Sequence, residues 1–140
     1  MSLAGLLDVV SGDPALARAL SAPSQATLDL SGPAGLRPFV IAGLVRRNRT
    51  VLAVTATGRE AEDLVAALGA LVDGHRVALY PSWETLPHER LSPRADTVGR
   101  RLAVLRRLRH PSSDDPATGP LDVVVAPVRS ILQPQVPGLG

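Results

Sequence analysis

The chain has 140 residues, of which 45% are hydrophobic, 20% are charged and only 2% are aromatic. This composition excludes a disordered chain and suits one globular domain, or part of one, with an aliphatic core. It contains no cysteine, which excludes disulfides and thiolate sites, and no apolar run approaches the roughly 20 residues of a membrane span. We therefore expect a soluble, cytoplasmic protein.

The net charge is only +2, although the isoelectric point is about 10.3. All fifteen basic residues are arginine, whose high pKa sets that value. One explanation is a genome biased toward arginine codons. The other is a surface that binds nucleic acid, which requires the arginines to cluster.

The first part of the chain, residues 1–24, predicts two short helices. Apolar residues between Leu3 and Val10 recur at helical spacing, and Asp13 followed by Pro14 is a typical helix start. Residues 26–30 alternate well enough to predict a short strand.

A glycine-containing turn follows that predicted strand and leads into an apolar helix. This order is the frame of a phosphate-binding loop, in which backbone N–H groups and the helix N-terminus face a phosphate. When Gly32 and Gly35 are placed on the pattern, Pro38 takes the position of the lysine and Phe39 that of the hydroxyl residue. Neither side chain can perform that chemistry. The sequence leaves two readings open, an ordinary strand-to-helix turn and a phosphate loop that has lost its function.

The middle of the chain predicts an α/β fold, a parallel sheet with flanking helices. Residues 50–55 read as a buried strand, Thr57 and Glu60 as a capping box that starts a helix closed by Gly74, and residues 76–80 as the next strand. Residues 121–126 form another continuous apolar run, followed by a short helix at 128–132.

An arginine-rich helix is predicted from Ser92 as N-cap and Pro93 as first residue. At about 100° per residue, its apolar face comprises Val98, Leu102 and Leu105. Arg101 falls at the margin of that face, where an unpaired charge would be costly. We therefore expect Arg101 to anchor the preceding loop, which contains Trp83, through Glu84 or a backbone carbonyl.

The outward side of this helix offers the only candidate for polyanion or partner contact, which comprises Arg100, Arg106, Arg107 and Arg109. A DNA-binding module built on helix 94–109 is thus one alternative function, and a functional nucleotide-binding P-loop enzyme is another. A solvated helix face is the simpler interpretation, because aromatic residues for stacking bases are not interleaved. Three scattered histidines show no metal-ligand spacing, and no nucleophile motif occurs, so we predict neither a metal site nor a catalytic residue.

Residues 80–108 carry a family resemblance. A Trp-Glu-Thr-Leu-Pro core at 83–87, which includes Trp83, Glu84 and Pro87, leads to Ser-Pro at 92–93, Asp96 and Arg101-Leu102. In this order, between a glycine loop and a Val-Val-Val-Ala-Pro-Val strand, the segment resembles bacterial transcription-repair coupling factors (Mfd). The resemblance covers about residues 28–132.

The resemblance implies a fold similar to the P-loop-type first domain of the excision-repair protein UvrB, in a degenerate form without ATPase activity. It implies N-terminal helices at 1–24, this module at 25–133, and a linker or truncated end at 134–140. It also implies that the full-length protein is an ATP-dependent DNA translocase, with ATP and magnesium bound downstream. RNA polymerase and DNA would be contacted downstream as well, UvrA would dock mainly beyond residue 140, and no cofactor would bind within these residues.

Overall fold

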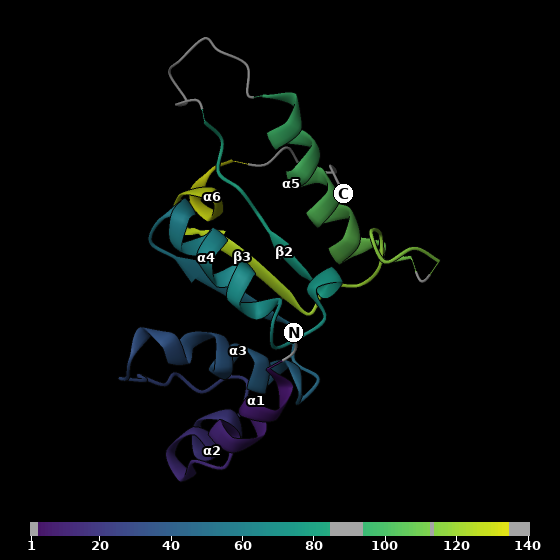
Figure 1. Ribbon diagram of the computed structural model, residues 1–140. Coiled ribbons are helices and arrows are strands. Elements are labelled where there is room, and N and C mark those ends of the chain that lie inside the picture. The colour runs from purple at the N-terminus through teal and green to yellow at the C-terminus, as the bar shows by residue number, and fades with distance from the viewer. Residues whose placement is uncertain (1–2, 85–93, 113, 135–140) are drawn as a thin grey trace.

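The computed structural model of the protein describes residues 3–84, 94–112 and 114–134. It is an α/β structure with a three-stranded parallel sheet, as the sequence predicts. The strands are β1 (Val51–Thr55), β2 (Val77–Leu79) and β3 (Val123–Pro127), in the order β1-β3-β2, so that β3 is central (Figure 1). The helices are α1 (Ala4–Ser11), α2 (Pro14–Leu20), α3 (Arg37–Val45), α4 (Gly58–Leu68), α5 (Ala95–Arg109) and α6 (Val128–Leu132), with 3-10 turns at Ala34–Leu36 and Gly74–Arg76.

Two helices start where their capping residues predict. The Asp13 carboxylate accepts hydrogen bonds from the backbone N–H groups of Ala15 and Leu16, both at 2.9 Å, at the start of α2. At the start of α4, the Thr57 hydroxyl accepts from the N–H of Glu60 at 3.2 Å, and the Glu60 carboxylate accepts from the N–H of Ala56. Local side-chain chemistry therefore positions both helix starts.

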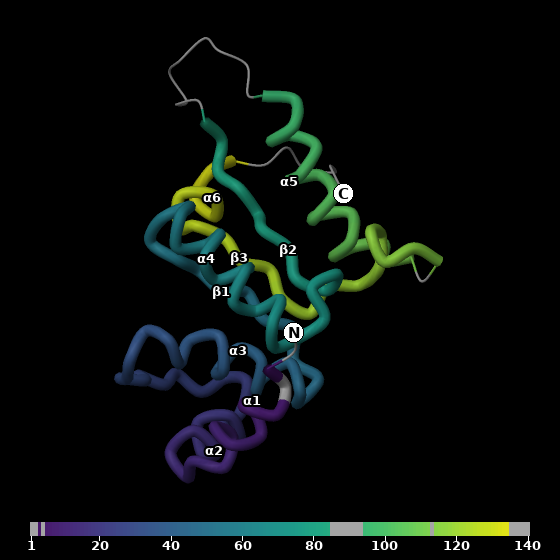
Figure 2. Tube along the Cα trace, viewed as in Figure 1, coloured from purple at the N-terminus to yellow at the C-terminus, as the bar shows by residue number. Residues whose placement is uncertain are grey.

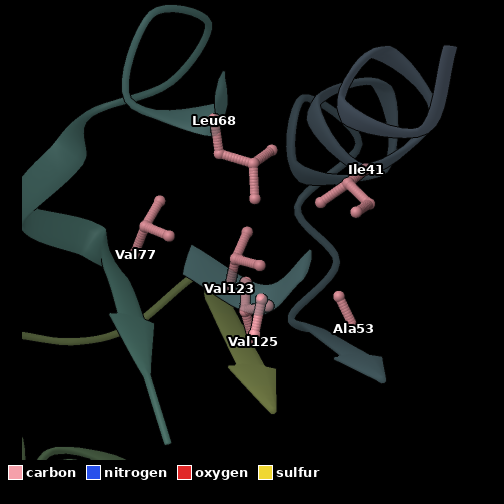
Figure 3. Packing of buried hydrophobic residues seen from close by; sticks show 7 residues of the cluster. Ile41, Ala53, Leu68, Val77, Val123 and Val125 are labelled. Atoms are coloured by element: carbon pink, nitrogen blue, oxygen red, sulfur yellow. The ribbon is translucent and has the colours of Figure 1, made fainter. Parts of the chain in front are cut away.

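One face of the sheet packs against α3 and α4. Figure 3 shows Leu68 and Ile41 reaching from these helices toward Val123 and Val125 in the central strand. The two valines are fully buried. The opposite face packs against α5, in a second cluster that comprises Tyr80, Val104, Leu121, Val124 and Ala126. The two crossover helices thus cover β3 from both sides, as parallel strands require.

The helices α1, α2 and α3 gather at one end of the molecule, and the chain between α2 and α3 loops out around them (Figure 2). A third cluster joins Leu7, Ala42 and Leu71, with Phe39 packed against it. The contact between α2 and α3 is close, since a Cβ on Gly43 would lie 2.7 Å from a methyl of Leu20. Helices α1 and α2 therefore pack on α3, which in turn contacts α4 and the sheet.

Several predicted boundaries are wrong. The strand predicted at residues 26–30 does not form; these residues are exposed and pair with none of the strands described. Helix α4 ends at Leu68 rather than shortly before Gly74, and the apolar residues after it still pack through turns. Helix α5 begins at Ala95 with Arg94 as its N-cap, two residues later than predicted, and the Ser92–Pro93 start lies outside the described residues. Of the described helices, none is long and apolar enough to cross a membrane.

Candidate functional site

The glycine turn lacks the geometry of a phosphate-binding loop. Residues 3–31, the described part of the chain before it, contain no strand, and neither Gly32 nor Gly35 adopts a left-handed backbone conformation. Pro38 lies in the first turn of α3, and Phe39 packs toward the cluster of Leu7 and Ala42. The two positions that would carry the cation and the hydroxyl are therefore occupied by half-buried packing residues.

The residues singled out after β2 do come together, around Arg101. Its side chain is 1% exposed and lies over two aromatic rings, with the guanidinium carbon 4.3 Å from the centroid of Tyr80 and 4.2 Å from that of Trp83. Its Nη1 donates a 2.6 Å hydrogen bond to the carbonyl of Pro81. The predicted anchoring of this loop through a backbone carbonyl is confirmed, and the acceptor is Pro81 rather than Glu84.

Arg101 is an unusual core residue because it forms no salt bridge with any carboxylate among the described residues. Among the described residues, none accepts a hydrogen bond from its buried Nε and Nη2 atoms. Burial lowers the pKa of the guanidinium, and the nearby Tyr80 opposes that shift. Burial likewise raises the pKa of the Tyr80 hydroxyl, and the positive charge of Arg101 partly offsets it. Among the described groups, the Pro81 carbonyl and the two aromatic faces offset the cost of burying this cation.

Helix α5 is rotated relative to the predicted face. Its buried row comprises Thr97, Arg101 and Val104, whereas Leu102, predicted to be apolar core, is 36% exposed. Hydrophobic spacing alone missed this rotation because the two polar members of the row find partners in the loop. The Thr97 hydroxyl donates to the carboxylate of Glu84, and this bond lowers the pKa of Glu84.

Gln133, which the sequence did not single out, also binds the loop after β2. Gln133, just after α6, accepts a 2.7 Å hydrogen bond from the N–H of Trp83 through Oε1. Its Nε2 donates to the Trp83 carbonyl at 3.4 Å. The amide thus holds the backbone of Trp83 as a neighbouring strand would. The sequence did not indicate this role, because Gln133 lies 50 residues from Trp83 in the chain.

The four candidate arginines for polyanion contact differ in their surroundings. Arg107, predicted to be solvated, donates to the carbonyls of Gly119 at 2.7 Å and of His75, and thereby ties α5 to two loops. Arg100 pairs with Asp96 at 3.2 Å along the helix. Arg106 and Arg109 are exposed and form none of the described ion pairs, and Arg100 stays largely exposed beside Asp96, so contact of these arginines with a polyanion or partner stays a prediction.

Two predicted signature residues remain, Asp96 and Pro87. Asp96 lies in the first turn of α5. Desolvation raises its pKa, but the charge of Arg94, backbone hydrogen bonds and Arg100 lower it overall. Pro87 lies outside the described residues. Within the described part of the chain, no group of three His, Asp or Glu residues could hold a metal ion.

Comparisons with known proteins give a consistent match. No protein-family model matches the chain. Over 143 aligned positions it is 52% identical to the transcription-repair-coupling factors of Mycobacterium bovis (strain ATCC BAA-935 / AF2122/97) and Mycobacterium tuberculosis (strain CDC 1551 / Oshkosh). The alignment covers 99% of this chain but 11% of each relative. The chain therefore spans about a ninth of the length of the curated relatives it matches.

Proposed function

We propose, proceeding from its 52% identity to transcription-repair coupling factors over 99% of its length, that this chain is a non-catalytic module of such a factor. The observation that carries the proposal is that Phe39, Arg101 and Arg107 make packing or loop-anchoring contacts. Pro38 and Phe39 replace the catalytic positions of a phosphate loop, and Arg101 and Arg107 hold loops through backbone carbonyls. The module is a degenerate relative of the UvrB nucleotide-binding domain.

In the whole protein, ATP hydrolysis, DNA translocation and release of stalled RNA polymerase belong to other regions, where ATP and magnesium bind. The present module contributes architecture and part of a docking surface. UvrA docks mainly through the domain beyond residue 140. The protein acts in the cytoplasm in nucleotide excision repair.

Calorimetric titration of the chain with ATP and Mg²⁺ tests the absence of nucleotide binding. We expect no saturable binding, because neither the strand nor the cation and hydroxyl of a phosphate loop is present. Inorganic tripolyphosphate is the control, since equal weak binding of both would report general attraction of polyanions to arginine. Micromolar affinity for ATP but not for tripolyphosphate would overturn the proposal.

A pull-down with UvrA tests the docking role. We expect capture by a chain extended through the next domain and none, or much less, by these 140 residues. Equal capture by both would locate the principal docking residues in the present module and contradict the division of labour.

A further inference from the structure

Helix α5, which covers the sheet on the side opposite α3 and α4, has an uncharged open face (Figure 1). Ala95, Gly99 and Ala103 recur at every fourth position and are all exposed. Leu102, beside them, is 36% exposed. Residues four apart on a helix share one side of it, so these four residues lie on the side of α5 that faces away from the buried Arg101. We call them the outer face of α5.

Gly99 is the unusual member of the outer face. A glycine inside a helix lowers the stability of that helix relative to alanine. A Cβ added at Gly99 would meet nothing within 4 Å, so the described packing of the chain does not require a glycine there. The side chains at a contact set the distance between two helix axes, and small ones allow the closest approach. The outer face is therefore shaped to receive a second helix.

Arginines surround the outer face. Asp96 is the only acidic residue of α5, and it already pairs with Arg94 and Arg100. The side chain of Arg100 is still 62% exposed, and Arg106 and Arg109 are exposed near the C-terminal end of the helix. Like charges across an interface repel each other, so a partner at this face must bring negative charge.

We propose that the outer face of α5 binds an acidic amphipathic helix of a partner protein. The apolar side chains of that helix seat on the small residues and on Leu102, and its carboxylates pair with Arg100, Arg106 and Arg109. The two helices pack antiparallel, because the first turns of the partner helix, where acidic residues are favoured, then lie over the arginines at the C-terminal end of α5. This inference rests on the docking role proposed above and gives it a location.

Two other occupants fit the outer face less well. DNA is bound chiefly through its phosphates, whereas the centre of this face, with Leu102 and the small residues, is uncharged. A second copy of the chain would bring the same arginines to the contact and so place like charges together. An acidic helix satisfies both the apolar centre and the basic surroundings.

NMR titration of the 140-residue chain with a synthetic helical peptide tests the proposal. The peptide has about 20 residues, enough to hold a helix, with a ridge of leucine and alanine and with glutamates in its first turns. We expect saturable shifts in the amides of Ala95, Gly99 and Ala103, with Ala66, exposed on α4, as the internal control. The same peptide with lysine in place of glutamate should bind about tenfold more weakly or worse. Equal binding of the two peptides, or the absence of shifts in α5, would overturn the proposal.

Two substitutions separate docking from folding. Gly99→Leu favours the helix but fills the space that the partner helix needs, so the unfolding temperature should hold or rise while the affinity for the acidic peptide falls about tenfold or more. Ala66→Leu, on α4, is the matched control. Arg106→Glu should weaken binding of the acidic peptide and strengthen binding of the lysine peptide, a reversal that loss of the fold cannot produce. Unchanged affinity in Gly99→Leu, or no reversal in Arg106→Glu, would contradict docking at this face.

Two further titrations address the other occupants. If a DNA duplex of about 20 base pairs shifts the same α5 amides and displaces the peptide, the face binds nucleic acid and the proposal is wrong. Shifts in α5 that grow with the concentration of the chain alone would identify a second copy and would also refute it. Failure of these tests leaves the ATP titration and the non-catalytic role unaffected, whereas ATP binding with intact peptide binding would refute only that role.

Discussion

The two outer strands of the sheet end in opposite ways. Beyond β2, the backbone of the chain is held by side chains: Arg101 binds the Pro81 carbonyl and Gln133 binds both polar groups of Trp83. Along β1, the backbone groups of Leu52 and Val54 have no partner among the described residues, and both side chains are exposed. Side chains of the same chain thus bind the backbone beyond β2, whereas β1 has β3 as its one strand neighbour among the described residues.

The largest effect on stability is expected from a substitution of Arg101, which binds the chain just after β2. Arg101→Ala removes a fully buried side chain, its hydrogen bond and its contacts with two rings, and should lower the free energy of unfolding by about 3 kcal/mol. Urea unfolding followed by the fluorescence of Trp83, the only tryptophan, measures it. Arg101→Met should cost less, because it fills the space and removes two unpaired N–H groups. Wild-type stability of Arg101→Ala would refute the anchoring role.

The next comparison uses two residues paired in register on the same face of the sheet. Val124→Ala, under α5, should cost about 2 kcal/mol, whereas Leu52→Ala should cost less than about 0.5 kcal/mol in this chain. Denaturant midpoints of the two variants provide the measurement. Equal losses would show that β1 is covered in solution and would remove the contrast between the two sides.

A smaller effect on stability is expected from a substitution of Gln133, whose side-chain amide binds the backbone of Trp83. Gln133→Ala removes both hydrogen bonds to the Trp83 backbone and should cost about 1 kcal/mol, with a change in Trp83 emission. Leu132→Ala is the matched control, because its side chain is 79% exposed. If the two variants have the same stability and the same Trp83 emission, the hydrogen bonds between Gln133 and Trp83 do not stabilise the fold.

The smallest effect is a pH dependence. Since the hydrogen bond from Thr97 lowers the pKa of Glu84 in the folded state, ionised Glu84 stabilises the fold at pH values above its ordinary pKa. This contribution disappears as the pH falls through the lowered, folded-state pKa. Thr97→Val should move the pKa of Glu84 upward, toward its ordinary value, as measured by NMR titration of the side-chain carboxyl. An unchanged pKa would show that another group holds it down.

Local chemistry made several parts of this fold predictable. Asp13 and the Thr57–Glu60 pair placed two helix starts, and the run of valines from 123 to 125 predicted a strand buried on both faces. Pro38 and Phe39, at the positions where a phosphate loop carries a cation and a hydroxyl, are apparent in the sequence itself. These features depend on neighbours within a few residues, which the sequence displays directly.

Other features were decided only when distant segments met. Residues 26–30 have the alternation of a strand but remain unpaired, because a strand needs a partner and none of the described segments provides one. Helical periodicity placed Arg101 at the margin of the apolar face of α5. It is buried instead because Tyr80, Trp83 and Pro81 offer partners to its guanidinium. The sequence by itself determined the helix starts at Asp13 and Thr57, the parallel sheet, and the lack of a lysine and a hydroxyl at positions 38 and 39. The tertiary structure alone decided which arginines became core, since the cost of burying a charge depends on the groups that surround it.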